Sequence, residues 1–159
     1  KTFAVYRTTN NGVFRSINMI EGLILTKLKT FPSEKGSVYQ SLSVDDEGYV
    51  GFGESYFSFI EYKAIKAWKF HKNMTLNLTV PIGAIRFNFV DLREGSATYK
   101  DRFEITLSKE NYQRITVPPM ILFGFKGLEK GSNIILNIAD MIHDDEECMN
   151  IGIDKYEFK

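Results

Sequence analysis

Short apolar or alternating runs, each closed by a turn signal, recur along most of the chain. Alternation is clearest from Ile85 to Phe89, where apolar residues are separated by Arg86 and Asn88. Successive side chains of a strand point to opposite faces, so this pattern indicates strands with one buried face. Turns such as Asn10-Asn11-Gly12 and Glu94-Gly95-Ser96 separate the runs. Many short strands at this spacing predict an all-β sandwich or barrel with few or no helices.

Length and charge narrow the class of protein further. The 159 residues suit one domain, 1–159, with a core of its own. Lys+Arg and Asp+Glu are both 20, and this balance argues against nucleic-acid binding, which needs clustered positive charge. No apolar run approaches the roughly 20 residues of a membrane helix, so no membrane partner is expected. The single cysteine, Cys148, excludes an internal disulfide and favours a reducing, cytoplasmic location.

Several motifs follow one another between Ala84 and Phe125. They read VDLR at 90–93, GSATY at 95–99, LSKEN at 107–111, VPP at 117–119 and GF at 124–125. In order and spacing this stretch resembles the central region of the dTDP-4-dehydrorhamnose 3,5-epimerases, a branch of the cupins. A thinner resemblance extends from Glu34 to Asp154. The resemblance implies a cupin jelly-roll barrel, commonly a homodimer that exchanges N-terminal strands, which would be residues 1–33 here.

The resemblance also implies a chemistry. In that family a histidine held by an aspartate removes a proton beside a 4-keto group, a tyrosine protonates the opposite face, and a lysine steadies the enolate. Position by position, these roles fall on Lys69 for the base, Ile142 or Met141 for the acid, and Leu76 for the lysine. Lysine is ordinarily protonated at neutral pH, Ile142 and Met141 cannot donate a proton, and Leu76 cannot stabilise the charge of an enolate. We therefore expect the usual catalytic set to be replaced, with activity altered or lost.

Two residues near these positions keep useful polarity. Lys66 stands where the family has an arginine that faces the diphosphate, and a lysine can bind phosphate as a point charge. His71 and Lys69 lie in a segment similar to the H-A-H-K motif of the sister 3,4-ketoisomerases, which makes them the candidate proton-transfer groups. In a strand, Lys69 and His71 point to one face and Lys66 to the other, unless a bulge intervenes.

The remaining candidates are substrate-binding residues that the resemblance places around the pocket. Gln40 stands where the family has a glutamate that faces the nucleotide, and Ile142 stands at the position of the family's catalytic acid. Trp68 and Phe123 border the pocket, where a ring can stack on a sugar or a base. The chain has only two histidines, and a cupin metal site needs several, so neither a metal nor another cofactor is expected. The acidic run at 144–147 is interpreted as a solvated loop.

Three functions stay open at the level of the sequence. The first is an enzyme of nucleotide-sugar biosynthesis with an altered mechanism that uses His71. The second is a cupin that binds a sugar or nucleotide sugar without catalysis. The third is a nucleotide-sugar 3,4-ketoisomerase, which needs proton transfer on only one face of the sugar. In each case the expected ligand is a nucleotide-linked sugar, dTDP-linked by the resemblance.

Overall fold

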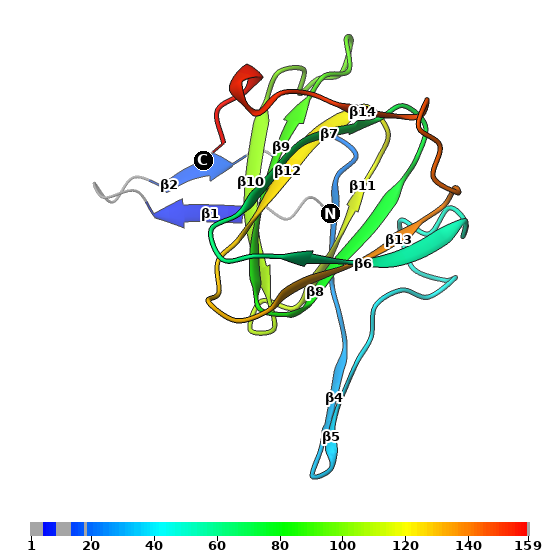
Figure 1. Ribbon diagram of the computed structural model, residues 1–159, viewed down its shortest axis with the longest axis vertical. Coiled ribbons are helices and arrows are strands. Elements are labelled where there is room, and N and C mark those ends of the chain that lie inside the picture. Colours follow the sequence, from blue (N-terminus) through cyan, green and yellow to red (C-terminus); the bar gives the residue numbers. More distant parts are fainter. Residues whose placement is uncertain (1–4, 9–13, 18, 159) are drawn as a thin grey trace.

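The computed structural model describes residues 5–8, 14–17 and 19–158, and strands account for nearly all of their regular structure (Figure 1). The one helical element in these ranges is a short 3₁₀ turn, η1 (Ile153–Lys155). The prediction of an all-β chain with few or no helices is therefore confirmed. The strands are β1 (Val5–Thr8), β2 (Phe14–Ile17), β3 (Ile24–Lys27), β4 (Thr30–Ser33), β5 (Gly36–Tyr39), β6 (Glu54–Ile60), β7 (Ile65–His71), β8 (Leu76–Ile82), β9 (Ala84–Asp91), β10 (Arg102–Ser108), β11 (Gln113–Val117), β12 (Ile121–Gly127), β13 (Asn133–Ala139) and β14 (Cys148–Asn150).

Two antiparallel five-stranded sheets form the barrel. Sheet I has the order β10-β9-β12-β7-β14, and sheet II has the order β3-β11-β8-β13-β6. Neighbours within a sheet are mostly distant in sequence, as when β12 lies between β9 and β7. Such crossing connections distinguish a jelly roll from a simple meander.

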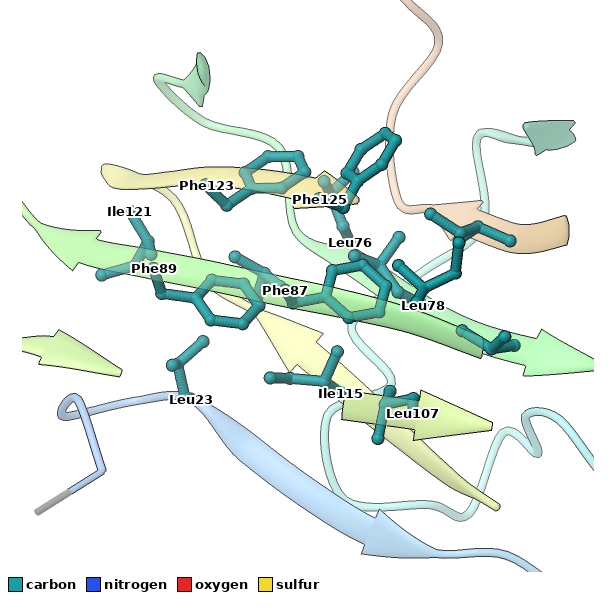
Figure 2. Packing of buried hydrophobic residues seen from close by; sticks show 14 of the residues in the cluster. Leu23, Leu76, Leu78, Phe87, Phe89, Leu107, Ile115, Ile121, Phe123 and Phe125 are labelled. Atoms are coloured by element: carbon teal, nitrogen blue, oxygen red, sulfur yellow. The ribbon is translucent and has the colours of Figure 1, made fainter. Parts of the chain in front are cut away.

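The apolar core lies between the two sheets, as Figure 2 shows for part of it. The alternation at 85–89 places Phe87 and Phe89 inside, and both are fully buried. Their rings lie 6.1 Å apart, and Phe89 lies 6.3 Å from Phe123 of β12. These centroid separations fall in the favourable range for aromatic pairs. Aromatic side chains from β9 and β12 thus fill one half of the barrel.

The VDLR and GSATY motifs meet in one hydrogen-bond network after β9. The carboxylate of Asp91 accepts bonds from Arg93 Nε at 2.9 Å, Ser96 Oγ at 2.7 Å and Thr98 Oγ1 at 2.7 Å. Burial alone would raise the pKa of Asp91, but these hydrogen bonds outweigh it and hold the pKa well below its ordinary value. In this chain the two motifs hold a turn closed at one end of the barrel.

The loop that precedes β6 is held on the outer face of sheet II by Arg114. Its guanidinium is fully buried and donates to the Ser41 carbonyl at 2.8 Å, to Asp46 Oδ2 at 2.7 Å and to the Glu47 carbonyl at 2.9 Å. A guanidinium that donates in several directions at once fixes both position and angle. The loop therefore reaches β6 from a defined direction.

The hairpin of β4 and β5 projects away from the barrel in Figure 1. Among the described strands these two pair only with each other. The hairpin is exposed over most of its length, with Phe31 55% and Val38 67% accessible. Of the N-terminal region 1–33, the residues 1–4, 9–13 and 18 lie outside the described part of the chain.

Candidate functional site

A cleft of about 320 Å³, partly open to solvent, lies between the two sheets. Each sheet contributes one wall. The sheet I wall consists of Lys69, His71, Phe123 and Phe125. The sheet II wall consists of Tyr56, Ser58, Leu76, Leu78, Ile135 and Asn137. The polar groups of this mostly apolar cleft are few and convergent, which is typical of a small-molecule site.

A buried histidine–carboxylate pair stands at the sheet I wall. His71 Nδ1 lies 2.7 Å from Glu147 Oε2, and both side chains are more than 90% buried. The other oxygen, Glu147 Oε1, accepts the backbone N–H groups of Asn73 and Met74, each at 2.9 Å. An ionised carboxylate can only accept, so Nδ1 carries the proton and Nε2 is the ring nitrogen left for a ligand.

Hydrogen bonding keeps Glu147 in its charged form. Burial would raise the pKa of Glu147, but the N–H of Asn73, the imidazole of His71 and the N–H of Met74 together lower it below its ordinary value. The run at 144–147 was expected to be a solvated loop, and for Glu147 that expectation is wrong, since the residue is 5% exposed. No pattern in the sequence indicates that His71 and Glu147, which are 76 positions apart, are in contact.

The strand pairing explains how the pair forms. β14 lies beside β7 with Cys148 opposite His71, so the residue before Cys148 reaches the end of β7. A turn delivers Glu147 to this place, because the N–H groups of Glu147 and Cys148 both donate to the Asp144 carbonyl. The local fold thus presents a carboxylate to the imidazole from a separate segment.

Lys69 lies two residues before His71 on the same strand face, and both line the cleft. The β12–β7 register pairs Phe123 with Lys69 and Phe125 with Lys66, which leaves one extra residue in β7. This bulge turns Lys66 to the same side as Lys69, where regular alternation would point it away. Lys66 itself is exposed and donates to the Phe59 carbonyl at 3.2 Å, outside the cleft lining.

The other predicted binding residues divide between the cleft and the surface. Phe123 is in the cleft wall, with its ring stacked on His71 at 6.0 Å and 22°. Trp68 is buried on the outer face of sheet I, where its indole N–H donates to the Tyr156 carbonyl. Ile142 is 72% exposed, and Gln40 lies at the base of the hairpin, bonded to Lys29. These placements put Trp68, Ile142 and Gln40 outside the cleft of this chain.

Sequence reasoning missed the polar residues of the sheet II wall, which are Tyr56, Ser58 and Asn137. Tyr56 of β6 lies directly opposite Asn137 of β13. Burial raises the pKa of the Tyr56 phenol, a hydrogen bond with Asn137 lowers it in part, and the net change is upward. Asn137 is 4% exposed, and its Oδ1 has no hydrogen-bond partner within the described residues. The alternation in β6 was visible in the sequence, but not which of its faces would point inward.

Two absences among the described residues bear on the site. No group of three or more His, Cys, Asp and Glu side chains there lies in an arrangement that could hold a metal ion. No helix in residues 5–8, 14–17 and 19–158 has the length and apolar character that crossing a membrane requires.

Comparisons with known proteins agree with this fold. A family model described as dTDP-4-dehydrorhamnose 3,5-epimerase matches residues 18–157. A dTDP sugar isomerase structure from Desulfovibrio desulfuricans is 33% identical over 85% of this chain and 87% of its own, with a TM-score of 0.82. A Bacillus anthracis dTDP-4-dehydrorhamnose 3,5-epimerase with TDP and PPi bound is 25% identical over 82% of this chain and 78% of its own, with a TM-score of 0.73.

A third structure supports the fold alone. The Legionella pneumophila epimerase in complex with dTDP-4-keto-L-rhamnose is 20% identical over 84% of this chain and 74% of its own, with a TM-score of 0.76. A search of curated proteins gives no match. The predicted jelly-roll fold of the cupins is confirmed by these neighbours.

Proposed function

The chain belongs to the dTDP-4-dehydrorhamnose 3,5-epimerase family, and we propose that it is an active nucleotide-sugar epimerase whose base is His71. The reaction is proton transfer at a carbon beside the ketone of a dTDP-linked 4-keto-6-deoxy sugar. One observation carries the proposal: the buried His71–Glu147 pair leaves an imidazole nitrogen at the cleft. Histidine is the commonest general base near neutral pH, and an orienting carboxylate fixes its tautomer.

Lys69 supports the second requirement of this reaction. Removal of the proton leaves an enolate, and a cation beside the developing oxygen lowers the barrier. Lysine is ordinarily cationic at neutral pH, and Lys69 shares the cleft wall with His71. With His71 as base, Lys69 has no need to lose its proton and can serve as the oxyanion partner.

The cleft divides the substrate in two. In this proposal the cleft, which is partly open to solvent, receives the hexose ring and not the whole nucleotide sugar. The nucleotide must then lie outside the cleft. The exposed Lys66, on the same side of β7, is available to its diphosphate there as a point charge.

We expect dTDP-linked sugars to stabilise the protein in a thermal-shift panel that also contains UDP-, GDP- and CDP-linked sugars. Ligand at about 100 times Kd adds about 2.7 kcal/mol to the free energy of unfolding, which raises Tm by several degrees. Lys66→Met should weaken the dTDP-sugar response, with Lys130→Met on the β12–β13 turn as the matched control. A panel without any response contradicts the proposal, and binding without turnover identifies a non-catalytic cupin.

We also propose that the protein is a homodimer that docks through the outer face of β6 and the β4–β5 hairpin. Phe57 and Phe59 point away from the barrel and are 60% and 65% exposed. The hairpin adds Phe31 and Val38, which are exposed as well. Exposed large apolar side chains often mark an interface, and a second copy with a projecting hairpin is a fitting partner.

The double variant Phe57→Ser, Phe59→Ser is expected to run as a monomer in size-exclusion chromatography with light scattering, whereas the wild type is expected to have twice the mass of one chain. The changes remove exposed apolar area, so they should leave the fold of the monomer intact. Met149→Ser, on the exposed β14 of the other sheet, is the matched control. A monomeric wild type at micromolar concentration contradicts the dimer.

A further inference from the structure

The sheet II wall of the cleft is unusual in its polarity. On β6, the two phenylalanines Phe57 and Phe59 point outward, while Tyr56 and Ser58 point into the cleft. Turning the polar face of a strand toward the interior costs free energy unless those groups find partners. The arrangement therefore indicates that the inward side chains serve a ligand.

Asn137 supplies an independent sign of that ligand. Its side chain lines the cleft and is more than nine-tenths buried, yet Oδ1 has no hydrogen-bond partner among the described residues. Native proteins rarely leave such an atom unpaired, because a buried acceptor without a donor is destabilising. A hydroxyl of a bound sugar is a donor of the right kind for this oxygen.

The pairing of Asn137 with Tyr56 settles what the phenol can do. Tyr56 lies directly opposite Asn137 in the β6–β13 pairing, and both side chains line the cleft. The amide N–H of Asn137 can donate to the phenol oxygen, an interaction that lowers the pKa of the phenol. The phenol O–H is then left to donate elsewhere. Because burial keeps the net pKa of Tyr56 above its ordinary value, the phenol stays protonated at neutral pH.

The two walls place Tyr56 across the cleft from the base. His71 and Lys69 belong to sheet I, and Tyr56 belongs to sheet II. All three line the same cleft. A flat enolate held between the walls would meet an imidazole on one face and a phenol on the other.

We infer that Tyr56 is the catalytic acid of this cleft and that Asn137 is its positioning residue, an inference that rests on the proposed function. His71 Nε2 takes the proton from the carbon beside the ketone, and the C–H electrons move to the enolate oxygen beside Lys69. Tyr56 then gives its proton to the same carbon from the opposite side, and the ketone re-forms. The imidazolium and the phenolate return to their starting states by proton exchange with water, so the net reaction is inversion without a co-reactant.

The resemblance could not have pointed to this residue. It placed the acid at Ile142 or Met141, in the segment that follows β13. Tyr56 comes from β6, more than 80 positions earlier, and reaches the cleft through the β6–β13 pairing.

The test separates exchange from inversion in D₂O, with a dTDP-linked 4-keto-6-deoxy sugar as substrate. Tyr56→Phe is expected to retain deuterium exchange at the carbon that His71 deprotonates while inversion falls by roughly 100-fold or more. Tyr99→Phe is the matched control, because Tyr99 has nearly the same exposure, 39% against 38%, and lies outside the cleft. Its exchange and inversion should both equal those of the wild type.

Two outcomes overturn the inference alone: a Tyr56→Phe protein that inverts as efficiently as it exchanges, or one that binds substrate but has lost exchange as well. Failure of the proposed function is distinct, because it appears as absent exchange in the wild type.

Asn137→Leu supplies a second readout. Removal of the unpaired acceptor should raise the Tm of the ligand-free protein while inversion falls, whereas a purely structural role for Asn137 predicts a lower Tm.

Discussion

His71→Asn is expected to reduce epimerisation by roughly 100- to 10,000-fold, the contribution of a general base. Asparagine can occupy the site and still accept or donate a hydrogen bond, but it cannot take up a proton at neutral pH. Binding of the dTDP-linked sugar should persist, because the nucleotide is held outside the cleft. Initial rates of product formation, measured with the Kd for the same ligand, therefore give a loss in kcat with little change in affinity.

The chain contains its own control for this change. His143 is the only other histidine, and its side chain is 53% exposed beside Asp145. His143→Asn should leave kcat unchanged. If His71→Asn turned over at the wild-type rate, His71 would not be the base and the proposed mechanism would be wrong.

Glu147→Gln is expected to cost nearly as much activity as loss of the base itself. The amide oxygen can still accept the N–H groups of Asn73 and Met74, which leaves the amide nitrogen facing His71 Nδ1. That nitrogen can only donate, so the proton of the imidazole moves to Nε2, the atom that must act as base. An imidazole held in this tautomer has no lone pair to offer the substrate, and we expect a loss of roughly 100- to 10,000-fold in kcat.

The same variant tests the electrostatic role of Glu147. Its pKa is lower in the folded protein than the ordinary value of 4.5, so its contribution to stability is complete above about pH 4.5 and is lost as the pH falls through the folded value. Glu147→Gln should therefore destabilise the protein at pH 7 by about 1–3 kcal/mol, with a gap to the wild type that narrows in acid. Glu146→Gln, one residue away and exposed, is the control. An equal gap at pH 7 and pH 3 contradicts this role.

The sequence predicted most of the fold for physical reasons that are local. Alternation from Ile85 to Phe89 marks a strand with one buried face, and the structure buries Phe87 and Phe89 as that pattern requires. The turn signal at Glu94-Gly95-Ser96 corresponds to the network around Asp91. The order of the motifs indicated the epimerase family. The family in turn implied the two-sheet arrangement, which no single segment of the sequence indicates.

The site was less predictable because its residues meet only through long-range pairing. Glu147 reaches His71 by way of β14, and the acidic run around it looked like a solvated loop. One extra residue in β7 reverses the face of Lys66, and a bulge of this kind leaves no mark in composition. On β6, Phe57 and Phe59 face outward while Tyr56 and Ser58 face the cleft, the reverse of the usual expectation for a half-buried strand.

The position-by-position comparison with the epimerase family therefore indicated which catalytic side chains are missing from their usual positions. It did not indicate which side chains take their place. It placed the base at Lys69, two residues from His71, and found no acid at Ile142. In the structure a histidine, a lysine and a tyrosine share the cleft, so the types of side chain that the reaction needs are present at different positions. The expectation that activity is altered or lost rested on positions alone, and the geometry of the cleft supports retained activity.

The decisive measurement is whether the purified wild-type chain moves carbon-bound hydrogen of a dTDP-linked 4-keto-6-deoxy sugar into solvent. In D₂O, followed by proton NMR, the signal of at least one proton beside the ketone should disappear in the presence of the wild type and persist with His71→Asn. Persistence of every such signal at wild-type protein concentrations that saturate binding would contradict the proposed chemistry, and would leave a cupin that holds its sugar nucleotide without changing it.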